Sequence, residues 1–78
     1  MRELTADQQG QLDRLLGSDP GLAGGVRPLL DGEFGIEARD LLLCHLSQRL
    51  ADGSSMRAAL VLALADAMRF ARGEQDDA

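Results

Sequence analysis

Hydrophobic residues recur every three or four positions along most of this 78-residue chain, which is the spacing of amphipathic α-helices. The apolar pattern is densest from Ser55 to Arg72, and no polar side chain occurs between Ala58 and Ala65. On a helical projection the apolar residues cover more than half of the circumference, with Leu64 at the centre of the widest arc. An ordinary surface helix needs an apolar stripe of only about 100°. The pattern therefore predicts a long, very apolar C-terminal helix that is covered by its neighbours and by another chain.

A first helix is expected from Ala6 to Leu16, because its start and end carry recognisable signals. Thr5 and Gln8 have the spacing of a capping box, in which each side chain accepts a hydrogen bond from the other residue's backbone N–H. Gly17 stands where a left-handed residue commonly ends a helix.

The segment after the first helix is less regular. Asp19 before Pro20 resembles a helix start, but Gly24-Gly25 is expected to interrupt that helix. The sequence instead favours a short helix from Val26 to Leu30, followed by a turn over residues 31–35. Phe34 is expected to lie underneath this turn.

A third helix is predicted from Ile36 to Leu50, with Asp52-Gly53 ending it and Ser54 or Ser55 capping the next. Its apolar face is expected to consist of Ile36, Leu42, Leu43, Leu46 and Leu50. Leu41 is expected to point away from this apolar face. Gly73 is expected to end the last helix before the acidic tail, residues 74–78.

These elements predict an all-α fold, a small bundle of three to four helices forming one domain over residues 1–78. No stretch alternates apolar and polar residues as a half-buried strand does.

The charge of the chain bears on its partners. The formal net charge is -5, with 13 acidic and 8 basic residues, all of the latter arginine, as in many GC-rich bacterial genomes. Nucleic-acid binding depends on clustered cations, so the sequence argues against it and favours a basic protein partner. The single cysteine, Cys44, fits a reducing cytoplasm. Neither a signal peptide nor a membrane-spanning segment is recognisable, and a cytoplasmic location without membrane contact is expected.

No residue pattern indicates catalysis, a cofactor or a metal. Cys44 and His45 are adjacent, so they diverge by about 100° on a helix, and no second Cys or His completes a zinc site. The glycines of residues 21–25 follow no strand and precede no Lys, unlike a phosphate-binding loop. The expected function is therefore non-enzymatic.

Three segments resemble the N-terminal domain of anti-sigma factors of the extracytoplasmic-function type, in the zinc-free variant. They are the sequence Leu29-Leu30-Asp31-Gly32-Glu33, the amphipathic stretch from Ile36 to Leu50, and Asp66-Ala67-Met68-Arg69. The zinc-binding branch has a His-Leu pair before two cysteines. Here His45-Leu46 matches that pair, but Arg49 and Asp52 occupy the cysteine positions. The resemblance implies a helical inhibitor that covers surfaces of a sigma factor.

The sequence thus predicts a protein-binding regulator, and its leading specific form is an anti-sigma-like inhibitor that sequesters a basic partner. Two alternatives stay open: a small acidic adaptor or secretion chaperone that masks a helix of its client, and a structural unit that pairs with its own copy. The residues expected to contact a partner are Leu41, Ala58, Leu62, Asp66 and Arg69.

Overall fold

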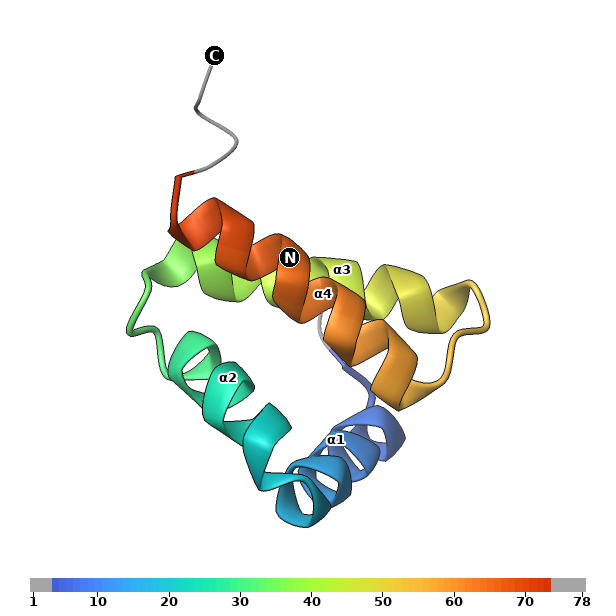
Figure 1. Ribbon diagram of the computed structural model, residues 1–78. Coiled ribbons are helices and arrows are strands. Elements are labelled where there is room, and N and C mark those ends of the chain that lie inside the picture. Colours follow the sequence, from blue (N-terminus) through green and yellow to red (C-terminus); the bar gives the residue numbers. More distant parts are fainter. Residues whose placement is uncertain (1–3, 74–78) are drawn as a thin grey trace.

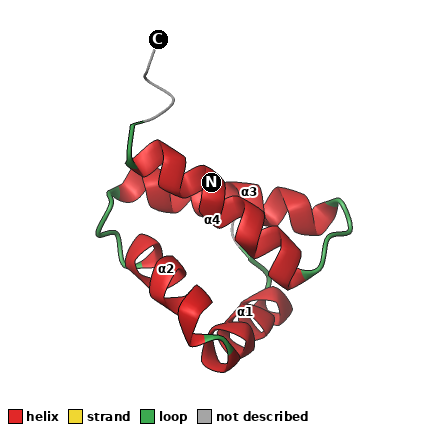
Figure 2. Cartoon of the chain, in the orientation of Figure 1, coloured by secondary structure: helices red, strands yellow, loops and turns green. Residues whose placement is uncertain are grey.

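The computed structural model describes residues 4–73, which form four helices without any strand. The helices are α1 (Ala6–Ser18), α2 (Pro20–Leu30), α3 (Ile36–Ala51) and α4 (Met56–Ala71). α3 and α4 form the most extensive helix pair, and α1 and α2 lie across it as the two arms of a V (Figures 1 and 2). The predicted all-α bundle is confirmed.

The start of α1 follows the sequence signals, but its end does not. Thr5 Oγ1 accepts a hydrogen bond from the Gln8 backbone N–H at 3.1 Å, and Gln8 Oε1 accepts one from the Thr5 N–H at 3.0 Å, so the capping box is confirmed. The prediction for Gly17 was wrong, since α1 continues through it to Ser18. Asp19 alone separates α1 from α2, and its carboxylate caps α2 by accepting from the Leu22 N–H at 3.1 Å.

α2 is longer than predicted, because Gly24-Gly25 does not interrupt it. Packing against α4 explains the difference. A Cβ atom at Gly25 would lie 3.2 Å from Leu64 Cδ2, so the missing side chain lets the two helices approach closely. Tertiary contact outweighs the low helix propensity of the two glycines, each worth about 1 kcal/mol relative to Ala.

α4 is not the long, very apolar helix that the sequence predicts. It has 16 residues, as many as α3, and Arg57, Asp66 and Arg69 bring charge to its sides. Its apolar circumference is wide because α4 packs against all three other helices. Leu64 is only partly buried, and the centre of the covered face consists of Ala59, Leu60, Ala63 and Ala67.

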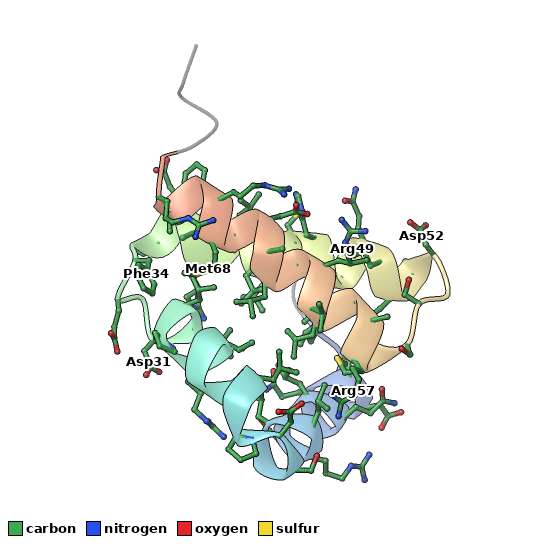
Figure 3. All side chains as sticks on the ribbon, viewed as in Figure 1. Asp31, Phe34, Arg49, Asp52, Arg57 and Met68 are labelled. Carbon is green, nitrogen blue, oxygen red and sulfur yellow. The ribbon has the colours of Figure 1, made fainter. Side chains whose placement is uncertain are left out.

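The core lies between the four helices, where side chains fill the space enclosed by the ribbons (Figure 3). Its largest fully buried members are Leu12, Val26, Leu29, Leu42, Leu46 and Leu60. Leu42 and Leu46 occupy the predicted inner face of α3, and Leu43 and Leu50 are partly buried. Ile36 was wrongly assigned to that face, since 71% of its surface is exposed.

The turn between α2 and α3 is present where predicted, but Phe34 does not lie beneath it. Gly32 and Gly35 adopt positive φ angles of 83° and 97°, which glycine accommodates without strain. Phe34 stands between them with 46% of its surface exposed. Arg39 ties the turn to the bundle, because its Nε donates to the Leu30 carbonyl at the end of α2 at 3.1 Å.

The ends of the last two helices agree with the sequence. Gly53 and Gly73 have positive φ angles just after α3 and α4, and Ser55 Oγ accepts from the Ala58 N–H at 3.2 Å. The predicted acidic tail lies outside the described residues. In residues 4–73 no helix has the length and apolar character that crossing a bilayer requires.

Candidate functional site

An exposed apolar stripe runs along the outer side of α4, opposite its covered face. Its members recur at intervals of three, one and three residues, so they lie in one row. They are Ala58, Val61, Leu62 and Ala65, which we call the α4 stripe. Val61 and Leu62 are each 47% exposed and are among the four large hydrophobic residues exposed in the described chain. Exposed apolar surface of this kind is typical of protein-contact sites.

A cluster of charged side chains borders the α4 stripe on the side of α3. Asp66 stands four residues after Leu62, and its side chain is 18% exposed. Its Oδ2 lies 2.9 Å from His45 Nδ1 and accepts a hydrogen bond from Arg49 Nη2 at 3.1 Å. Its Oδ1 accepts from Arg69 on the next turn of α4. We call these four residues the Asp66 cluster.

The Asp66 cluster holds the carboxylate in its charged form. The hydrogen bond with His45 lowers the pKa of Asp66 below its usual value, with further lowering by Arg49 and by the positive charge of Arg69, while partial burial opposes the shift. A carboxylate held by these donors is a weak base. The cluster is thus suited to joining α3 to α4 and to fixing the charges beside the stripe.

The predicted contact residues lie on one side of the α3–α4 pair, with unequal exposure. Ala58 and Leu62 belong to the α4 stripe, and Arg69 follows it with 58% of its side chain exposed. Asp66 is mostly covered by its partners. Leu41 is only partly exposed, one turn before His45 on α3.

Four residues of this surface were not predicted as contact residues: Val61, Ala65, His45 and Arg49. Val61 and Ala65 were detectable in principle, because they lie three and seven residues after Ala58. No local signal reveals that His45 and Arg49 meet Asp66, since 21 and 17 residues separate them along the chain.

The described residues offer little for a metal. Cys44 is a free, partly buried thiol, and the ring of His45 is engaged with Asp66. Within residues 4–73 no group of three or more His, Cys, Asp and Glu side chains could hold an ion.

Comparisons with protein families, with curated proteins and with solved structures each gave no match.

Proposed function

We propose that this protein is a non-enzymatic, protein-binding regulator that docks a partner on the α4 stripe. The exposed row of Ala58, Val61, Leu62 and Ala65 carries the proposal. Covering such a row removes apolar surface from water, which is the main driving force of association. Its spacing also suits a partner helix, whose side chains interdigitate with rows three and four residues apart.

The specific form of this proposal is an anti-sigma-like inhibitor of a basic partner. The similarity of residues 29–33, 36–50 and 66–69 to anti-sigma domains supports it, and so does the net charge of -5, which attracts a basic protein over long range. An acidic adaptor or chaperone would use the same stripe to mask a client helix.

Self-association is a second candidate, favoured by the symmetry of the stripe. The residue sizes read small, large, large, small from Ala58 to Ala65. An antiparallel second copy would therefore place Val61 opposite Leu62 and Ala58 opposite Ala65, the arrangement of a two-fold interface.

The test is partner capture with wild-type protein and with a Val61→Ser/Leu62→Ser double variant. Both side chains are about half exposed, so the variant should keep the helical circular dichroism and melting behaviour of the wild type. We expect it to lose the captured protein. A sigma factor in the wild-type eluate supports the inhibitor, and a secreted client supports the chaperone.

Sedimentation of the wild type and the double variant measures their oligomeric state and so tests self-association. A wild-type dimer that becomes monomeric in the double variant supports it. Full retention of every partner and of the oligomeric state by the variant would refute the α4 stripe as the contact surface.

A further inference from the structure

Arginine side chains border the α4 stripe on both of its long sides. Arg57 stands one turn before Val61. Arg49 reaches the other side from α3, because its Nη2 lies 3.1 Å from Asp66 Oδ2, and Asp66 stands one turn after Leu62. In Figure 3, Arg49 and Arg57 lie on opposite sides of the α4 ribbon. The exposed apolar row therefore lies between two cations.

A third arginine continues the row of the stripe itself. Arg69 stands four residues after Ala65, on the same side of α4. Its guanidinium contacts Asp66 Oδ1, yet 58% of its side chain remains exposed. A helix laid along the stripe would thus reach Arg69 near the C-terminal end of α4.

The carboxylates beside these arginines are less exposed and are already engaged. The side chain of Asp66 is 18% exposed and that of Asp19 31%, against 35% for Arg49 and 59% for Arg57. Asp19 accepts from Arg57 at 2.8 Å through one oxygen and from a backbone N–H through the other. Both oxygens of Asp66 are engaged within the Asp66 cluster. A partner on the stripe would therefore meet guanidinium groups more than carboxylates.

The three guanidinium groups can each bind a further carboxylate. A guanidinium carries five N–H donors. Arg49, Arg57 and Arg69 each use one nitrogen toward a carboxylate of this chain. The planar group commonly binds a carboxylate through two parallel hydrogen bonds. Asp52, an exposed acid, lies beyond Arg49 at the end of α3 (Figure 3) and makes no ion pair within residues 4–73.

We propose that the segment docked on the α4 stripe is an amphipathic helix of another protein, with Asp or Glu residues on both sides of its apolar row. Charge complementarity identifies this occupant: its apolar side chains would cover the stripe, and its carboxylates would meet the three arginines. The inference rests on the proposed function, because it takes the α4 stripe as the contact surface. A partner that is basic overall can still dock through such a helix, since exposed charges farther apart than about 8–10 Å are largely screened.

A cationic apolar surface also suits an anionic membrane, but the charge of the whole chain argues against that occupant. The formal net charge is -5, so an anionic bilayer repels the protein as it approaches. A single helix presents only a few carboxylates, and the repulsion is correspondingly weaker.

The probe is a fluorescently labelled helical peptide of alanine, leucine and glutamate, with leucine at every third or fourth position and glutamate on both sides of the leucine row. Titration with the wild-type protein at neutral pH should give a saturable rise in anisotropy that weakens as salt is added. Arg57→Gln/Arg69→Gln should weaken binding about three- to tenfold, the change expected on losing two exposed ion pairs. The same peptide with lysine in place of glutamate should bind less tightly than the glutamate form.

The matched control is Arg14→Gln/Arg27→Gln, which makes the same change in net charge at exposed positions of α1 and α2. It should bind the glutamate peptide as the wild type does. Circular dichroism and melting confirm that each variant is folded.

Val61→Ser/Leu62→Ser separates this inference from the proposed function. Loss of peptide binding in this variant, with Arg57→Gln/Arg69→Gln unaffected, would keep the stripe as the contact surface and overturn the acidic occupant. Retention of binding by the serine variant would contradict the stripe itself.

Three further results would overturn the proposal. Equal weakening by the two arginine double variants would indicate a response to net charge alone. Equal or tighter binding of the lysine peptide would give the occupant the opposite charge. Binding of anionic lipid vesicles without binding of the glutamate peptide would assign the stripe to a membrane, and a stripe-dependent dimer that the peptide does not displace would assign it to a second copy.

Discussion

The two faces of α4 are similar in composition and opposite in environment. The covered face consists of Ala59, Leu60, Ala63 and Ala67, and the exposed α4 stripe of Ala58, Val61, Leu62 and Ala65. Both are rich in alanine and both contain leucine. α4 contacts α1, α2 and α3, so the positions of these neighbours decide which face is buried. An apolar helix therefore does not itself reveal which of its sides remains free for a partner.

The largest difference between the two faces should appear when one leucine of each is truncated. Leu60 is fully buried, so Leu60→Ala should lower the free energy of unfolding by about 2–5 kcal/mol. That loss approaches the whole stability of a domain this small. Leu62→Ala should change it by about 0.5 kcal/mol or less. Urea denaturation followed by circular dichroism measures both.

Similar destabilisation by Leu60→Ala and Leu62→Ala would show that the stripe is part of the core, and the proposed contact surface would have to be abandoned.

Asp66 stands at the border of the two faces, three residues after the buried Ala63 and four after the exposed Leu62. Asp66→Asn removes the charge that His45, Arg49 and Arg69 share and leaves these donors facing one another. We expect a loss of about 1–3 kcal/mol in the free energy of unfolding at neutral pH. Asp52→Asn is the control, because Asp52 is exposed and its side chain makes no hydrogen bond within residues 4–73. An equal effect of the two substitutions would contradict the role of the cluster.

The dependence of the free energy of unfolding on acidic pH should show a smaller effect that is specific to the Asp66 charge. Folding lowers the pKa of Asp66 from about 3.8. The charged carboxylate therefore stabilises the fold above that pH, and this stabilisation is lost as the pH falls through the folded-state pKa. The stability difference between wild type and Asp66→Asn should therefore shrink in acid. The pKa of Asp19 is also lowered, by its hydrogen bond with Arg57. Asp19 contributes the same pH-dependent stability to the wild type and to Asp66→Asn, so its effect cancels in the difference between them. Urea titrations from neutral to strongly acidic pH measure the difference. A constant gap would mean that the Asp66 charge is not the source of the stability.

The features predicted correctly from the sequence are those that depend on residues a few positions apart. Thr5 with Gln8 and Ser55 with Ala58 act over three residues, so their residue types suffice to predict the caps. Phe34 is predicted to lie beneath the turn, but it is 46% exposed, between Gly32 and Gly35, whose positive φ angles shape the turn.

Contacts between residues distant in the sequence account for the features of the structure that the sequence pattern did not predict. The pairing of His45 with Asp66 depends on how α3 lies beside α4, and the continuity of α2 through Gly24-Gly25 depends on where Leu64 packs. Neither follows from local propensity, since each requires the position of a helix that is distant in sequence.

The smallest expected effect concerns the edge of the covered face of α4, where Leu64 meets α2. Gly24→Ala places a methyl group in open space on an exposed helical position, so it should raise the free energy of unfolding by about 0.5–1 kcal/mol through helix propensity alone. Gly25→Ala has the same propensity gain, but its Cβ would lie 3.2 Å from Leu64 Cδ2 and displace that side chain. We therefore expect Gly25→Ala to give less stabilisation than its neighbour. Adding Leu64→Ala to each variant relieves the contact and should bring the two alanine effects together. A gain at Gly25 equal to that at Gly24 in the wild-type background would show that α2 and α4 approach less closely, and that the covered face of α4 ends before Leu64.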